Sequence, residues 1–275
     1  MMNQLKTIIL FGLLSVIVIF AGQILGGQTG VTFALILALA MNIGGYFFSD
    51  KIALKMSGAQ PAGENEYPQL QTMLEQLAKK MNIPTPQLYI IHEEQANAFA
   101  TGRDPQHASV AVTEGLMRIL SDEEIEGVLA HELAHIKNRD ILIATIASIL
   151  ASMLSYLGNV SIFSNNDEEE RHPLTGILAF LVLPIAATLI QLAISRQREF
   201  VADASAAYAI GSGRPLAMAL RKIEQSAQMM PMQQSPGLAS LYIANPLGGA
   251  WGSKLTALFS THPPTEERIK KLERI

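Results

Sequence analysis

Length, composition and charge exclude several classes of protein. The chain has 275 residues, of which 20 are Lys or Arg and 24 are Asp or Glu, so charged residues make up only 16% of the sequence. Soluble globular domains average roughly 25%. The net charge of −4 and the lack of a basic stripe argue against a nucleic-acid partner. Because there is no cysteine, disulfides, thiolate metal ligands and a cysteine nucleophile are excluded.

The charges are missing from three long stretches of the sequence. These stretches, which contain no Asp, Glu, Lys or Arg, are residues 7–48, 141–166 and 172–195. A helix needs about 20 mostly apolar residues to cross a bilayer. The stretches therefore predict four membrane spans, at residues 7–25, 31–48, 141–162 and 174–194. The rest of the chain has the charge density of a soluble domain, which predicts a polar domain attached to a lipid bilayer.

The basic residues near the ends of the spans predict the orientation in the membrane. Lys and Arg at span ends favour the cytosolic side. One side carries Lys6, Lys51, Lys55, Lys137, Arg139, Arg196 and Arg198, and the other carries only Arg171. Both termini and the polar domain are therefore predicted to lie in the cytosol. A cleaved signal peptide is the alternative for the first span.

The polar domain is predicted to consist of two segments of the chain, separated by a pair of spans. The predicted order is a first transmembrane hairpin at residues 1–48, the first part of the domain at 49–140, a second hairpin at 141–194 and the second part of the domain at 195–275. The fold class is thus α+β, mainly helical, with four transmembrane helices and a small β-sheet in the cytosolic domain.

The first part of the polar domain is predicted to contain helices around this sheet. Apolar residues recur at helical spacing in residues 67–80. Short strands are predicted at residues 87–91, 96–102 and 109–112. A capping box at residues 121–124 begins another helix. Because no Gly or Pro stops this helix, it is predicted to continue unbroken into the third span.

This capped helix carries the sequence His131-Glu132-Leu133-Ala134-His135. Two histidines four residues apart lie on one face of a helix, so both imidazoles can bind the same zinc ion. Glu132 lies beside them, where a carboxylate can take a proton from water at the metal. The motif predicts one Zn²⁺ per chain, with His131 and His135 as ligands and Glu132 as the general base.

A hydrolytic zinc site needs a third protein ligand, and Glu199 is the predicted one. His135 lies six residues before the third span and Glu199 five residues after the fourth. On antiparallel helices, both would lie roughly 8 to 9 Å from the membrane face. One helical turn further on, Asp203 is predicted to accept the free N–H of a ligating histidine and to fix its tautomer.

The motif from His131 to Asp140, followed about 60 residues later by Glu199 and Asp203, resembles the gluzincin pattern of thermolysin-type peptidases. Together with the four predicted spans, residues 97–102 and His262-Pro263-Pro264, it makes the chain similar over its full length to the HtpX family of membrane-bound zinc metallopeptidases. The resemblance implies a cytosolic gluzincin-like peptidase domain.

What the family resemblance implies for function goes beyond the motif itself. It implies a plasma-membrane endopeptidase that cleaves misfolded or damaged membrane proteins in quality control, so its partners are polypeptides and the bilayer. Residues 97–102 resemble the strand that holds an extended substrate by β-augmentation, which makes Asn97 a candidate substrate-binding residue. By the same resemblance, His262 and Arg268 lie near the zinc and are candidates for binding substrate or the transition state.

Two alternatives remain open from the sequence, which gives no indication of oligomeric state. A CAAX-type prenyl protease has a related zinc motif, although four spans rather than a larger membrane barrel argue against it. The chain could also be a membrane receptor or scaffold with structural zinc. A structural site is normally closed by four protein ligands and has no use for a glutamate at the position of Glu132.

Overall fold

The computed structural model describes residues 2–63, 65–149, 196–232, 236–246 and 263–275. Besides a helix at residues 141–149, the helices in the described part of the chain are α1 (Met2–Met56), α2 (Pro68–Met81), α3 (Glu114–Ile119), α4 (Asp122–Lys137), α7 (Arg196–Ile210), α8 (Arg214–Met229), α9 (Pro236–Ala239) and α11 (Thr265–Leu272). The strands are β1 (Gln60–Pro61), β2 (Gln87–Ile91), β3 (Ala98–Asp104) and β4 (His107–Thr113). Most of the predicted third span, the whole predicted fourth span and His262 lie outside the described residues.

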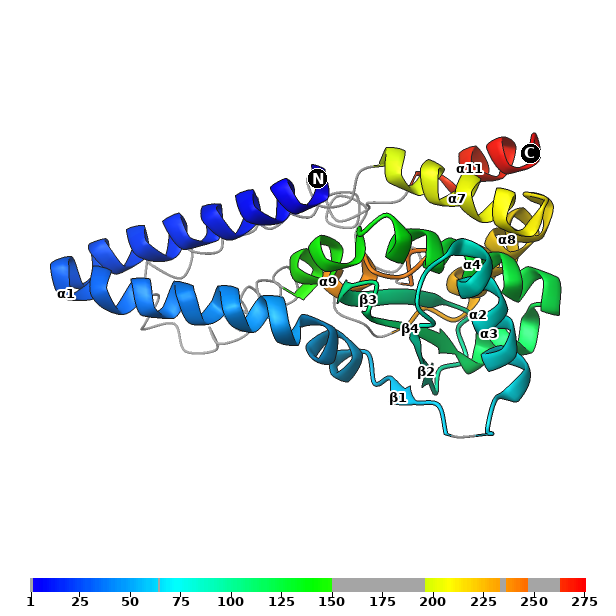
Figure 1. Cartoon of the computed structure of the whole chain (residues 1–275), viewed down its shortest axis with the longest axis horizontal. Helices are drawn as coiled ribbons and strands as arrows, with labels where there is room; N and C mark the ends of the chain where they lie inside the picture. Colours follow the sequence, from blue (N-terminus) through cyan, green and yellow to red (C-terminus); the bar gives the residue numbers. More distant parts are fainter. Residues whose placement is uncertain (1, 64, 150–195, 233–235, 247–262) are drawn as a thin grey trace, which may run out of the picture.

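Helix α1 is a hairpin of two apolar arms that projects away from the rest of the molecule (Figure 1). It folds back at Gly26 and Gly27, and Gly27 has φ of 55°, which glycine adopts without a steric penalty. The arms, Thr7–Ile24 and Gly26–Met56, are long and apolar enough to cross a membrane. They agree with the first two predicted spans, although the second arm continues past residue 48 to Met56.

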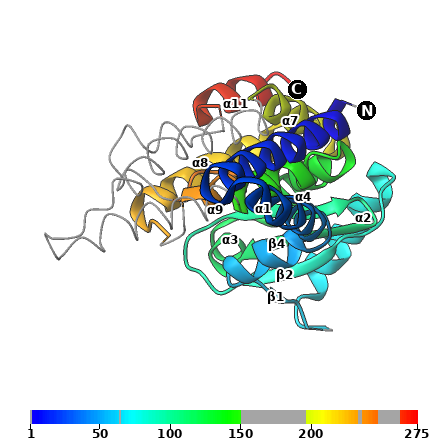
Figure 2. The same ribbon diagram turned by 90° about the vertical axis from the view of Figure 1, so that its left-hand side faces the viewer.

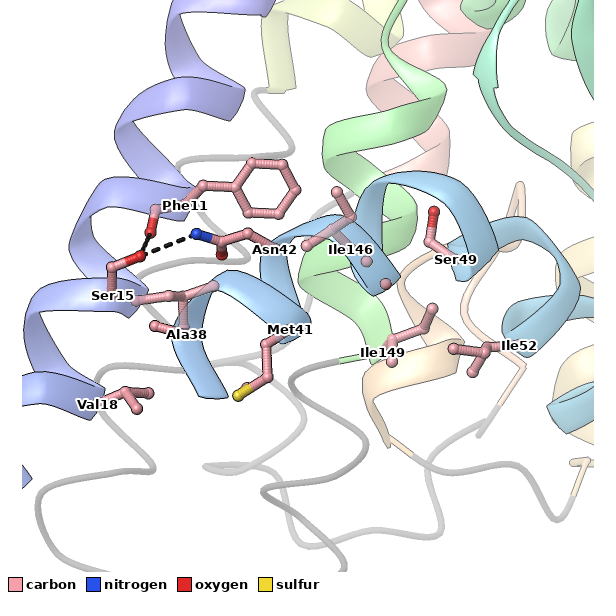
Figure 3. Close-up of a pocket in the computed structure, with 13 residues that line it drawn as sticks. Phe11, Ser15, Val18, Ala38, Met41, Asn42, Ser49, Ile52, Ile146 and Ile149 are labelled. Atoms are coloured by element: carbon pink, nitrogen blue, oxygen red, sulfur yellow. Dashed lines mark hydrogen bonds between the residues drawn. The ribbon is translucent and has the colours of Figure 1, made fainter. Parts of the chain in front are cut away.

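The two arms of the hairpin contact each other through small and polar residues. A Cβ atom added to Gly30 would lie 2.0 Å from the Gly22 carbonyl oxygen, so the close approach requires glycine. Further along, the side chain of Asn42 donates a hydrogen bond of 2.9 Å to the hydroxyl of Ser15 (Figure 3). Hydrogen bonds between polar side chains of this kind stabilise the association of apolar helices in a membrane, so this bond favours the observed pairing of the arms.

The four strands form one mixed sheet in the order β1-β2-β4-β3. Strands β2 and β4 are parallel, and both outer pairs are antiparallel. Strand β3 therefore lies at an edge of the sheet. Its alanines Ala98 and Ala100 belong to the core that also includes α4, and Phe99 belongs to the core on the other face. The three strands predicted from the sequence are all confirmed.

Helix α4 lies between the sheet and the layer formed by α7, α8 and α11 (Figures 1 and 2). Its N-terminus has the predicted capping box, in which Ser121 and Glu124 satisfy each other's backbone N–H groups. Small residues allow neighbouring helices to approach. A Cβ atom on Gly127 would lie 2.9 Å from the backbone nitrogen of Leu216 in α8. The result is a central helix that is buried on almost every side.

The prediction that this helix continues unbroken into the third span is wrong. Helix α4 ends at Lys137, and Arg139 has the left-handed φ of 58°. A new helix then covers residues 141–149 as far as the chain is described. The N–H of Asp140 donates to the carbonyl of His135, and its own carbonyl accepts from Ala144 in the next helix. This junction turns the Asp140 side chain back toward the end of α4.

Candidate metal centre

The predicted ligands His131, His135 and Glu199 come together where α4 packs against α7. The two Nε2 atoms are 3.1 Å apart. The Glu199 carboxylate lies 3.4 Å from the Nε2 of His135 and 3.8 Å from that of His131. Ligands of tetrahedral zinc, each about 2.0 to 2.1 Å from the metal, are roughly 3.3 Å apart. The three donors therefore fit one zinc ion.

Each histidine is oriented by a carboxylate at its other ring nitrogen. Asp203 Oδ1 lies 3.0 Å from Nδ1 of His131, as predicted, and Asp140 Oδ2 lies 3.4 Å from Nδ1 of His135. A proton on Nδ1 that is donated to a carboxylate leaves the lone pair of Nε2 free for a metal. Burial lowers the pKa of His131 to about 4, so this ring is neutral at physiological pH.

The charges around His135 favour a cation at the same place. Burial opposes protonation of this ring, but the carboxylates of Glu199, Asp140 and Glu132 outweigh it and raise the pKa of His135 to about 9. The same negative charges would stabilise a divalent metal ion. The set of two imidazoles and one carboxylate is the donor set of a hydrolytic zinc site that keeps a further position open for water.

Glu132 lies beside the ligands, against the edge strand. Its carboxylate accepts a hydrogen bond from the backbone N–H of Ala100 in β3, and its side chain is almost completely buried. Burial raises the pKa of Glu132 to about 7, although the nearby His135 opposes the shift. A carboxylate with a pKa in this range can take up and release a proton near neutral pH.

Arg268 comes from α11 and lies behind the ligands, fully buried. It donates two hydrogen bonds to Asp203, of 2.9 and 2.7 Å, and its Nη1 lies 3.7 Å from Glu199. The same Nη1 donates to the carbonyl of Ile243. The guanidinium group therefore holds the two acidic residues of α7 in place. Its predicted contact with substrate stays a prediction, as does that of His262.

Asn97 lies at the start of β3, completely buried. Its side-chain amide nitrogen donates a hydrogen bond of 2.9 Å to the carbonyl of Ala244. Its side-chain amide oxygen accepts hydrogen bonds from the backbone N–H groups of Ala98 and Ala244. The backbone N–H of Thr113 in β4 donates to the carbonyl of Asn97, and the N–H of Asn97 donates to the Thr113 hydroxyl. These contacts attach residues 243–244 to the edge strand, and a direct contact of Asn97 with substrate stays a prediction.

Asp140 and its partner Arg198 are the residues of the site whose roles the sequence analysis did not assign. The guanidinium group of Arg198 lies 3.4 Å from Asp140, and both side chains are largely buried. Asp140 is the last residue of the motif that begins at His131, so the sequence pattern already includes it. Its role depends on the break after α4, because a continuous helix would turn its side chain away from His135.

The fold and the site define a zinc metallopeptidase in which two histidines of α4 and a glutamate of α7 are placed together where they could hold the metal. The model of peptidase family M48 matches residues 64–275. The Protease HtpX homolog of Thermodesulfovibrio yellowstonii is 50% identical over 99% of this chain and 98% of its own length. The Protease HtpX homolog of Sulfurihydrogenibium sp. is 47% identical over 100% of this chain and 97% of its own length. The chain therefore belongs to peptidase family M48, among the HtpX-type zinc metalloproteases.

A solved structure supports the fold independently. The crystal structure of S. mikatae Ste24p aligns with 97% of this chain at a TM-score of 0.50 and 19% identity. The chain covers 62% of the length of that protein. The comparisons confirm the predicted enzyme class, the zinc cofactor, the membrane character and polypeptides as substrates. They leave the receptor or scaffold with structural zinc without support.

Proposed function

We propose that this chain is a zinc endopeptidase in which Glu132 acts as general base. His131, His135 and Glu199 would hold Zn²⁺, which when bound polarises the scissile carbonyl and acidifies the attacking water. Glu132 takes the proton from that water and passes it to the amine of the leaving fragment. The observation that carries this assignment is that Glu132 lies between the ligand cluster and the edge strand, in hydrogen-bond contact with Ala100.

We propose that the substrate backbone binds along the edge of β3 that faces away from β4. An extended peptide can add to an exposed sheet edge through main-chain hydrogen bonds, without any fixed side-chain sequence. Because β3 runs past Glu132, a peptide on this edge would bring its carbonyl groups to the catalytic carboxylate. Recognition through the backbone suits an enzyme whose substrates share an unfolded state and no common sequence.

We propose that these substrates are misfolded or damaged membrane proteins, cleaved at the cytosolic surface of the plasma membrane as part of quality control. The apolar hairpin supports this, because it leads directly into β1 and so attaches the peptidase fold to the bilayer. Arg103 in β3 lies 5.5 Å over the ring of Phe47 in the second arm. The edge strand therefore lies close to the membrane-spanning helices.

Glu132→Gln tests the proposed catalytic role. The amide cannot accept the water proton, so cleavage of an unfolded protein such as casein is expected to fall by about 10² to 10⁴. Zinc content, measured by atomic absorption, should remain at one ion per chain. Glu123→Gln is the matched control, because Glu123 is exposed on the first turn of the same helix. Substantial cleavage by Glu132→Gln would contradict the assignment.

A further inference from the structure

The edge of β3 that faces away from β4 is already occupied at one end by the chain itself. The N–H of Ile243 donates a hydrogen bond of 2.9 Å to the carbonyl of Ala98, as a neighbouring strand would. The side-chain amide of Asn97 binds the next residue: it donates to the carbonyl of Ala244 and accepts from the N–H of Ala244. The segment that includes these residues lies beside the start of β3 (Figure 1).

The hydrogen bonds of Asn97 show which groups of β3 face outward. Asn97 and Thr113 exchange bonds, so the backbone of Asn97 faces β4. Alternate residues of a strand face opposite ways, so Ala98, Ala100 and Gly102 face outward. The carbonyl of Ala98 is bonded to Ile243 and the N–H of Ala100 to Glu132. The outward groups beyond these are the carbonyl of Ala100 and the backbone of Gly102.

The segment at Ile243 is a fixed part of the fold. Ile243 and Tyr242 are 1% and 0% exposed, and the Tyr242 ring packs edge-to-face on Phe99 with centroids 5.1 Å apart. The carbonyl of Ile243 accepts a hydrogen bond of 3.0 Å from Arg268, which also holds Asp203. Ile243 is thus hydrogen-bonded to the substrate edge on one side and to the support of the zinc ligands on the other.

We propose that Ile243 and Ala244 form a stop at the Ala98 end of the substrate edge and thereby fix where a substrate strand ends relative to the zinc. This rests on the proposed binding of substrate along β3. Antiparallel pairs outnumber parallel ones, and an antiparallel substrate would run with its C-terminal side toward Ala98. Since Glu132 contacts Ala100, about two residues after the scissile bond fit on the edge before the stop.

The proposal makes the enzyme sensitive to peptide length on one side only. The probes are synthetic peptides built on a cleavage site that the zinc-loaded full chain itself produces in casein, extended one residue at a time at either end. Each further pair of backbone bonds on the N-terminal side is expected to raise kcat/KM about three- to tenfold. Extension beyond the second residue on the C-terminal side is expected to change it less than about twofold.

A variant separates the stop from the rest of the cleft. Asn97→Ala removes both hydrogen bonds that hold Ala244. The kcat/KM of C-terminally extended peptides should therefore rise relative to that of short ones. The dependence of kcat/KM on N-terminal length should stay unchanged. Ser240→Ala is the control, because Ser240 lies in the same segment but bonds Ser148 in the helix at 141–149. Ratios within one variant are unaffected by a general loss of stability or of active enzyme.

The wild-type length series decides the proposal even if Asn97→Ala fails to fold. An equal rise in kcat/KM on extension at both ends, or a rise on extension at the C-terminal end alone, would overturn the proposed stop. A folded Asn97→Ala enzyme with the wild-type length dependence would also overturn it. A failure of the proposed function looks different, because then no peptide in either series would be cleaved in a chelator-sensitive way.

Discussion

Asp203 joins the metal centre to the C-terminal helix through one carboxylate. Its Oδ1 lies 3.0 Å from Nδ1 of His131 and 2.7 Å from Arg268, and its Oδ2 accepts a further bond from Arg268. Burial alone would raise the pKa of Asp203, but the charge and hydrogen bonds of Arg268 and the hydrogen bond with His131 outweigh it and lower the pKa to about 2. The residue is therefore ionised at neutral pH.

Asp203→Asn should weaken zinc binding without removing a ligand. The amide is neutral and can present its NH₂ group to His131, which disfavours the tautomer that the metal needs. Loss of such a supporting contact typically costs 10- to 100-fold in metal affinity. Competition with a chromophoric chelator measures the change. Glu267→Gln, an exposed substitution on α11, is the control and should leave the affinity as it is.

The pKa of His135 predicts how zinc affinity depends on pH. In the metal-free protein this pKa is about 9, above the ordinary value of 6.5, so the ring carries a proton that zinc must displace. Affinity should therefore rise up to about tenfold per pH unit from pH 7 and level off above pH 9. By linkage, the protonated ring stabilises the metal-free fold below pH 6.5, and this stabilisation is lost as pH rises through 9.

Calorimetric titrations of zinc in buffers of different ionisation enthalpy measure the proton released. Release of about one proton per zinc at pH 7.5, declining toward pH 10, is the expected result. Affinity that is flat across this range would show that His135 is neutral before the metal binds.

At the residue scale, the sequence predicted the ligand set because His131 and His135 share a helical face and Glu199 lies at a matching distance from a span. It also predicted the contact of Asp203. It did not predict that Arg268 is completely buried behind the ligands, because that depends on how α11 docks on α7 and α8. Spacing along the chain carries no information about that packing.

At the scale of elements, the α2 helix, the strands and the capping box agree with the local patterns of apolar residues and caps. The break after α4 does not follow from these local patterns. Its cause is not a helix-breaking residue but a left-handed Arg139, a conformation that costs a non-glycine residue about 1 to 2 kcal/mol. The contacts of Asp140 with His135 and Arg198 offset this cost, and they exist only in the folded protein.

Ser121→Ala tests the contribution of the capping box to the central helix. The hydroxyl of Ser121 accepts a bond from the N–H of Glu124, and its loss should destabilise the protein by about 0.5 to 2 kcal/mol. Thermal unfolding in detergent measures this as a lower Tm. Ser205→Ala, which removes only an exposed bond within α7, should change stability by less than about 0.5 kcal/mol. Equal effects of the two variants would contradict the role of the cap.

At the scale of the molecule, the predicted orientation in the membrane can be tested with single cysteines, because the chain has none of its own. Gln28 at the hairpin turn and Gln60 after α1 are exposed, so cysteine is tolerated at both. An impermeant maleimide added to intact cells should label Gln28→Cys and leave Gln60→Cys unlabelled. The reverse pattern would place the peptidase fold outside the cytosol.

The chain-wide separation of the parts of the metal centre has a consequence for biosynthesis. His131 and Arg268 are in contact although 137 positions separate them, and Arg268 binds Asp203 across 65 positions. Contacts that close such long loops form late in folding. A chain still on the ribosome has its histidine motif long before α11 can dock behind it. We therefore expect a nascent chain to gain full peptidase activity only after α11 has been synthesised and has docked.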